Sequence, residues 1–99
     1  VTGVRYIEGA TKLEKIEQAD GVFVCIGKIP NTAFLGDAVP LSKSGYVLTN
    51  AWMATEVAGI YAVGDVRKKA FRQISTAVGD GTEGALAAQH YINNLLASM

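Results

Sequence analysis

Two continuously apolar runs constrain the fold of this chain more than any other feature. They read GVFVCIG, residues 21–27, and GIYAV, residues 59–63, which Gly64 and Asp65 terminate. Neither alternates between polar and apolar residues, as a strand with one solvated face does. Short apolar runs that are rich in β-branched and aromatic residues are typical of strands buried on both faces, as in a parallel sheet. We therefore expect an α/β fold class.

Composition excludes several classes of function. Nine basic residues balance nine acidic ones, so we expect neither nucleic acid nor an anionic membrane as a partner. The 49% hydrophobic content is typical of a globular chain, and no apolar run approaches the ~18 residues of a membrane span. Cys25 is the single cysteine, which excludes an internal disulfide and a cysteine-rich metal site. We expect Cys25 to be buried, and the protein to work in the reducing cytoplasm.

Weaker patterns predict the remaining elements. Residues 1–7 alternate enough for a strand, and residues 8–20 suit a turn and a second, partly exposed strand, or a short helix. Both prolines lie in a long connection at residues 28–45, and residues 45–50 suit a short strand. A long helix is expected from about Gln73 onward. Its apolar stripe, at alternating +4 and +3 steps, comprises Ile74, Val78, Gly81, Ala85, Ala88, Ile92 and Leu95.

The helix contains a literal G-x-G-x-x-G at Gly79, Gly81 and Gly84. A dinucleotide-binding fingerprint needs a strand directly before it and an acidic residue about 20 positions later. Residues 71–78 show no convincing strand, and no acidic residue follows Glu83, so this interpretation fails. We expect the glycines to give the helix a small contact face for close approach, although a frayed helix start would also tolerate them.

Three motifs in combination resemble one family. They are G-x-x-P at residues 27–30, T-x-x-x-G-[IV]-[FY]-A-x-G-D at residues 55–65, and R-Q-I-x-T-A-x-G-D-G at residues 72–81. From end to end, the chain resembles the C-terminal segment of the bacterial-type, low-molecular-weight thioredoxin reductases. These are FAD- and NADPH-dependent members of the pyridine nucleotide–disulfide oxidoreductases.

The resemblance implies a partial FAD/NAD(P)-binding fold, Rossmann-like and three-layered, with a few strands and one long C-terminal helix. Residues 1–26 would be terminal strands of the NADPH-binding domain. Residues 27–99 would be the C-terminal part of the FAD-binding domain. The two glycine fingerprints and the redox C-x-x-C of a complete enzyme have no counterpart in these 99 residues. We therefore expect this chain to be part of a longer reductase.

The same resemblance implies a cofactor site. Asp65 would accept hydrogen bonds from the ribityl chain of FAD, and Gly64 would let the backbone approach that chain. Arg72, Gln73 and Ile74 would lie beside the pyrimidine edge of the flavin, at the positive end of the helix. No catalytic residue and no metal ligand is expected in this chain.

The implied reaction passes electrons from NADPH to FAD, then through the C-x-x-C to thioredoxin or a similar disulfide protein, in a homodimeric enzyme. The isolated chain would be inactive and would bind FAD weakly or not at all. Two related alternatives are the flavoprotein of alkyl hydroperoxide reductase and a ferredoxin–NADP reductase. An alternative of another class is a non-catalytic module that self-associates through exposed strand edges or through its helix of small residues.

Single residues outside the motifs are interpreted structurally. We expect Arg67, Lys68 and Lys69 to lie in a solvated loop, and His90 to be a surface histidine. We expect Trp52 and Met53 to pack in a core or between domains.

Overall fold

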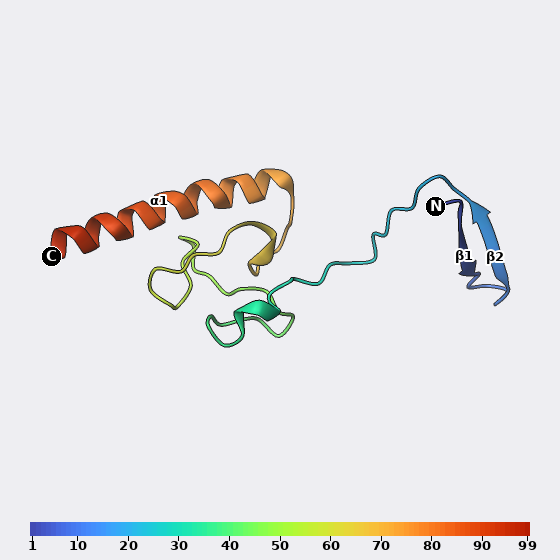
Figure 1. Ribbon diagram of the computed structural model, residues 1–99, viewed down its shortest axis with the longest axis horizontal. Helices are drawn as coiled ribbons and strands as arrows, with labels where there is room; N and C mark the ends of the chain where they lie inside the picture. Colours follow the sequence, from blue (N-terminus) through green and yellow to red (C-terminus); the bar gives the residue numbers. More distant parts are fainter.

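The computed structural model describes residues 1–99 as a β-hairpin, an extended linker and a loop-rich body on which one long helix lies (Figure 1). The strands β1 (Gly3–Ile7) and β2 (Glu14–Gln18) form the hairpin, and α1 (Ile74–Ser98) is the helix. Two short 3-10 helices, η1 (Ala33–Leu35) and η2 (Gly64–Val66), lie in the body. The strands expected within residues 1–7 and 8–20 and the helix expected from about Gln73 are therefore confirmed. No helix is both long and apolar enough to cross a membrane.

The hairpin is a separate unit at one end of the chain. Its strands are antiparallel, with Gly3 opposite Gln18 and Ile7 opposite Glu14. The turn is closed by Glu8, whose N–H donates to the carbonyl of Leu13 at 2.9 Å. The hairpin makes no contact with α1 or with the 3-10 helices (Figure 1).

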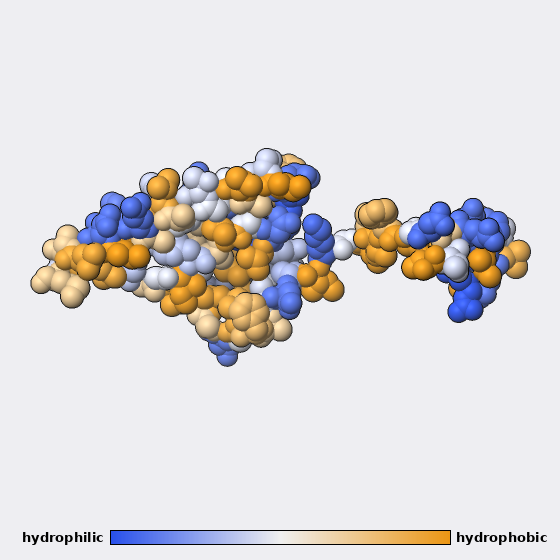
Figure 2. All heavy atoms as spheres, turned by 45° about the horizontal axis from the view of Figure 1, so that its top comes forward, coloured by the Kyte–Doolittle hydropathy of each residue, from blue (hydrophilic) through white to orange (hydrophobic).

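The body consists mainly of loops joined by isolated β-bridges, and its core is small. Isolated bridges pair Val47 with Leu41 and with Arg67, and Ala54 with Tyr61. Val47 and Met53 belong to the seven residues of the chain that are buried. Large apolar side chains are therefore exposed on several sides, on the linker and along α1 (Figure 2).

Three expected strands do not form. Residues 21–27 are an extended linker without a paired neighbour, residues 45–50 contribute two isolated bridges, both at Val47, and residues 59–63 contribute one at Tyr61. A β-strand is stabilised by hydrogen bonds to a neighbouring strand, and this chain supplies no such neighbour for these runs. For the same reason Cys25, expected to be buried, is exposed.

The helix packs through a different face from the one expected. Most of the stripe is exposed, including Ile74, Val78, Ile92 and Leu95. The body instead contacts Ala77, Asp80, Gly84 and Ala87. Asp80 and Ala87 do not belong to the apolar stripe and lie on the opposite side of the helix. An ion pair and close backbone packing therefore decide the orientation of α1, and the more apolar side has no partner in the chain.

Gly84 is the glycine that close packing requires. A Cβ at this position would lie 2.5 Å from Cγ1 of Val63 and 3.5 Å from Cβ of Met53. At Gly79 and Gly81 an added Cβ would meet nothing within 4 Å. The expectation that the glycines give a small contact face is therefore correct for Gly84 and wrong for Gly79 and Gly81.

Candidate functional site

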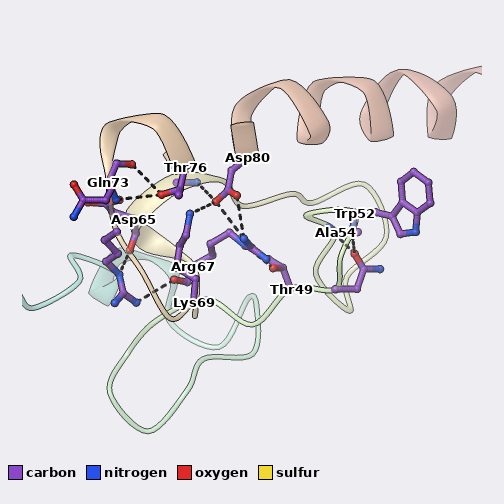
Figure 3. A network of polar contacts seen from close by, with 12 residues as sticks. Thr49, Trp52, Ala54, Asp65, Arg67, Lys69, Gln73, Thr76 and Asp80 are labelled. Atoms are coloured by element: carbon purple, nitrogen blue, oxygen red, sulfur yellow. Dashed lines mark hydrogen bonds and ion pairs between the residues drawn. The ribbon is translucent and has the colours of Figure 1, made fainter. Parts of the chain in front are cut away.

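Asp80 on α1 fastens the helix to the loop that follows residue 63 (Figure 3). Its carboxylate accepts a hydrogen bond from Nη1 of Arg67 at 3.1 Å and one from Nζ of Lys69 at 2.8 Å. The backbone N–H of Gly64 donates to the same carboxylate at 3.0 Å. Arg67 also donates through Nε to Oγ1 of Thr49 at 2.9 Å. One carboxylate thus joins three points of the loop to the first turns of α1.

The groups of this network are largely removed from water. The side chains of Asp80 and Lys69 are each 11% exposed, and that of Arg67 is 14% exposed. The expected solvated loop is therefore wrong for Arg67 and Lys69, although Lys68 is exposed. Burial raises the pKa of Asp80, but the hydrogen bonds from Lys69, Arg67 and Gly64 outweigh it, so this pKa lies below its ordinary value.

A pH dependence follows from this lowered pKa. Because the pKa is lower in the folded chain than in the unfolded one, the stabilisation is complete above the ordinary aspartate pKa of about 3.9. It is lost as the pH falls through the folded value. We expect the free energy of unfolding, measured by urea titration with α1 followed by circular dichroism, to fall below about pH 4.

The control for this measurement is Glu83→Gln, which removes an exposed carboxylate from α1. It should leave the decline unchanged, whereas Asp80→Asn should make the profile flatter. Glu8, whose pKa is lowered by Lys15 and Thr11, lies in the hairpin and does not touch α1. A flat profile in the unmodified chain would contradict the ion-pair network.

Arg72 closes the loop between η2 and α1. Its Nε donates to the carbonyl of Asp65 at 3.0 Å, and its Nη2 donates to the carbonyl of Arg67 at 3.2 Å. Its guanidinium also lies 3.7 Å from the ring centroid of Tyr46, within the range of a cation–π interaction. Arg72 therefore holds Asp65 close to the start of the helix.

Gln73 is the N-cap of α1 and has extended backbone angles. Its own N–H donates to Oγ1 of Thr76 at 3.1 Å. The backbone N–H groups of Ile74 and Ser75 have no preceding turn of helix to accept their hydrogen bonds. They give this end of α1 a partial positive charge.

An open cavity of about 510 Å³ lies between the loop and the start of α1. Four of the five residues expected from the sequence to bind a cofactor line it, namely Asp65, Arg72, Gln73 and Ile74. The fifth, Gly64, is buried and does not line the cavity, and its φ is +72°. A Cβ on Gly64 would lie 3.6 Å from that of Ala77, so the loop and helix approach closely there.

The chemistry of this cavity suits a polar, electron-rich ligand. The carboxylate of Asp65 can accept hydrogen bonds from hydroxyl groups, and the helix start can donate hydrogen bonds to an electron-rich edge. Lys28 adds a positive charge, and its Nζ is 3.6 Å from Oδ2 of Asp65. The wall formed by Ile74, Ala77 and Val78 is apolar and can support a flat ring.

Sequence reasoning missed Lys28 and Asp80. Lys28 lies within the G-x-x-P motif, but nothing in that motif shows that the segment reaches a cavity lined by residues 65–78. Asp80 lies within the R-Q-I-x-T-A-x-G-D-G motif. Arg67 and Lys69 are two residues apart, so an extended segment places both side chains on one side. This spacing could have indicated that they share an acidic partner.

A second open cavity, of about 540 Å³, lies farther along α1. It is lined mainly by apolar and aromatic side chains, among them Trp52, Tyr61 and Tyr91, with His90 and two asparagines. Met53 is buried, as expected, whereas Trp52 is exposed and does not belong to the core of this chain. His90 is exposed, as expected. The cavity lacks a charged group and a helix start, so we assign the candidate site to the other one.

The chain matches the family profile described as "Pyridine nucleotide-disulphide oxidoreductase" over residues 2–81. The chain belongs to this family. Curated relatives include the thioredoxin reductase of Bacillus subtilis, 40% identical over 96% of this chain and 30% of that protein. Another is a subunit of the alkyl hydroperoxide reductase of Staphylococcus epidermidis, 42% identical over 93% of this chain and 18% of that protein.

The fold agrees with the family. The crystal structure of T. acidophilum thioredoxin reductase matches with a TM-score of 0.74 and 43% identity, over 95% of this chain and 31% of that one. The expected class, a partial α/β fold of the FAD/NAD(P)-binding, Rossmann-like type, is therefore confirmed. The chain spans about a third or less of the length of these relatives.

Proposed function

We propose that the chain is the C-terminal part of the FAD-binding domain of an NADPH-dependent thioredoxin-disulfide reductase. The observation that carries the proposal is that Asp65 and the start of α1 line one cavity. The relatives support it independently, since the similarity to the B. subtilis thioredoxin reductase extends over nearly the whole chain.

The residues of the cavity fit one side of FAD. Asp65 would hold the hydroxyl groups of the ribityl chain. Arg72, Gln73 and Ile74 would lie along the pyrimidine edge of the ring system. The apolar wall of Ala77 and Val78 would support the ring, and Lys28 would add positive charge at the same side.

When bound, FAD supplies the electron-transfer chemistry, and this chain supplies its position and its electrostatic surroundings. The start of α1 stabilises negative charge at the pyrimidine edge by about 0.3–2 kcal/mol. Since about 1.4 kcal/mol corresponds to about 30 mV for a two-electron couple, the helix can tune the flavin potential by tens of millivolts. Asp80 and Arg72 fix the geometry, because they hold the Asp65 loop against the helix.

The finer assignments are also part of the proposal. Residues 1–26 would belong to the NADPH-binding domain and residues 27–99 to the FAD-binding domain, which agrees with the separate hairpin and the linker (Figure 1). The whole enzyme would be a cytoplasmic homodimer, with thioredoxin or a similar disulfide protein as its partner. The similarity to the alkyl hydroperoxide reductase of S. epidermidis supports one alternative, the same role in a flavoprotein of that kind.

A chimera tests the proposal. These 99 residues would replace the matching C-terminal segment of the B. subtilis thioredoxin reductase, which is 40% identical over 95 residues. We expect the purified chimera to contain FAD and to reduce thioredoxin with NADPH. A folded chimera that binds no flavin would contradict the FAD site. A chimera that binds flavin but reduces a peroxiredoxin instead of thioredoxin would favour the alternative.

The isolated chain should bind FAD weakly or not at all. It provides one wall of the cavity, and its body has few buried residues to keep that wall in place. Titration of FAD into the purified chain, followed by flavin fluorescence, should show no saturation at micromolar concentrations. Stoichiometric yellow protein after gel filtration would contradict this expectation.

A further inference from the structure

We propose that Tyr46 is a positioning residue of the flavin site and acts by holding the guanidinium of Arg72. The inference rests on the proposed function, but it concerns a residue that lies outside all three family motifs. Every contact that carries it is made within the body of this chain.

Three contacts hold the guanidinium of Arg72. Its Nε and Nη2 donate to the carbonyls of Asp65 and Arg67, at 3.0 and 3.2 Å. Its central carbon lies 3.7 Å from the ring centroid of Tyr46. An arginine suits this arrangement, because its flat group donates through a fixed fork and stacks on an aromatic ring at the same time. Tyr46 is the one side chain among these three partners, since the other two are backbone carbonyls.

The backbone of Tyr46 is itself fixed on both sides. Its N–H donates to Oγ of Ser42 at 3.1 Å, and its carbonyl accepts a hydrogen bond from the N–H of Ser42 at 2.7 Å. The next residue, Val47, is 3% exposed and forms backbone hydrogen bonds with residues 66–68. The ring is therefore held at a defined place beside the loop that leads to Arg72.

The ring of Tyr46 matters more than its hydroxyl group. The hydroxyl is 3.5 Å from the carbonyl of Lys28, which is at the limit of a hydrogen bond. The ring, in contrast, lies within the distance at which a cation–π interaction is favourable. A phenylalanine at this position should therefore do the same work.

The position of Arg72 bears on the flavin. Arg72 lines the cavity of about 510 Å³ that we assign to FAD, whereas Tyr46 does not. A positive charge there favours the reduced flavin, which carries more negative charge at its pyrimidine edge, over the oxidised one. Because this effect falls with distance, it decreases when the guanidinium loses the support of the ring. Tyr46 thus influences the flavin through Arg72.

The chimeric reductase provides the test, with the affinity for FAD and the midpoint potential of the flavin as readouts. Tyr46→Leu removes the ring face, and we expect it to weaken binding of oxidised FAD about threefold. It should weaken binding of reduced FAD about threefold more, which lowers the two-electron potential by about 14 mV. Tyr46→Phe keeps the ring face and should match the unmodified chimera in both readouts. A loss in Tyr46→Phe equal to that in Tyr46→Leu would contradict a role of the ring.

Tyr61→Leu is the matched control. Tyr61 is half-buried like Tyr46, and its hydroxyl donates to the carbonyl of Ala87 at 3.4 Å. It has no cation over its ring and does not line the flavin cavity. Its loss should leave the flavin potential unchanged. Equal shifts of the potential in Tyr46→Leu and Tyr61→Leu would show a general loosening of the body and would overturn the positioning role.

A double-mutant cycle tests whether Tyr46 acts through Arg72. Arg72→Lys keeps the positive charge but removes the flat fork that stacks on the ring. In this background Tyr46→Leu should have little further effect on the potential, because the group that it positions is gone. Additive shifts of the potential would show that Tyr46 acts independently of Arg72 and would overturn the inference.

The same measurements separate this inference from the proposed function. A folded chimera without FAD would contradict the flavin site, and the role of Tyr46 would fall with it. A chimera that binds FAD, and in which Tyr46→Leu changes neither affinity nor potential, would overturn the role of Tyr46 alone and leave the flavin site in place.

Discussion

Asp80→Ala is expected to cost about 3 kcal/mol of the free energy of unfolding of the body, the largest effect of any single substitution considered. The reason is that Arg67 and Lys69, whose side chains are 14% and 11% exposed, lose their only acidic partner while they stay largely buried. Gly64 also loses the acceptor for its N–H. Urea titration followed by the circular dichroism of α1 measures this loss.

The controls separate the ion pairs from the helix itself. Asp80→Asn keeps the shape of the side chain and one acceptor oxygen, so it should cost less than Asp80→Ala. Glu83→Ala removes an exposed acidic side chain from the same helix and should change the free energy by less than about 0.5 kcal/mol. If Asp80→Ala were as mild as Glu83→Ala, the network would not hold α1 on the body.

Gly84→Ala and Gly79→Ala should change stability in opposite directions. Alanine favours a helix over glycine by about 1 kcal/mol at either position. At Gly84 the new Cβ would lie 2.5 Å from Cγ1 of Val63, a β-branched side chain with little rotamer freedom. Overpacking of this kind costs about 1–3 kcal/mol, and the preference for alanine offsets about 1 kcal/mol of it, so we expect a net loss of up to about 2 kcal/mol.

Gly79 is the matched control for this substitution, because an added Cβ there meets nothing within 4 Å. Gly79→Ala should therefore stabilise the chain by about 1 kcal/mol. The same urea titration measures both variants. A gain of stability in both would show that Gly84 does not pack closely against Val63 and Met53, and would place the contact face of α1 elsewhere.

The elements that could be predicted from the sequence are those whose backbone hydrogen-bond partners lie within the chain. The hairpin strands pair with each other, and a helix satisfies its own backbone groups, so local patterns suffice for both. The apolar runs at residues 21–27 and 59–63 have the composition of buried strands, but the neighbours that would bury them are not in these 99 residues. These runs therefore have the composition of sheet strands but form no sheet in this chain.

The orientation of α1 could not be predicted from apolar periodicity. That pattern leaves Asp80 outside the apolar stripe, whereas the folded helix packs Asp80 against Arg67 and Lys69. The positions of the site residues were easier to anticipate, because Asp65 and residues 72–74 are close in sequence and one loop joins them. Family motifs selected these residues, and the structure gathers four of the five around one cavity.

The most direct test of the flavin site is the affinity of the chimeric reductase for FAD, with and without Asp65. Asp65→Ala should weaken FAD binding by about tenfold or more, since hydrogen bonds to a charged group contribute about 1.5–3 kcal/mol. Asp37→Ala, which removes an exposed carboxylate outside the cavity, should leave the dissociation constant unchanged. Equal affinity in both variants would contradict the assignment of Asp65 and the start of α1 to a flavin site.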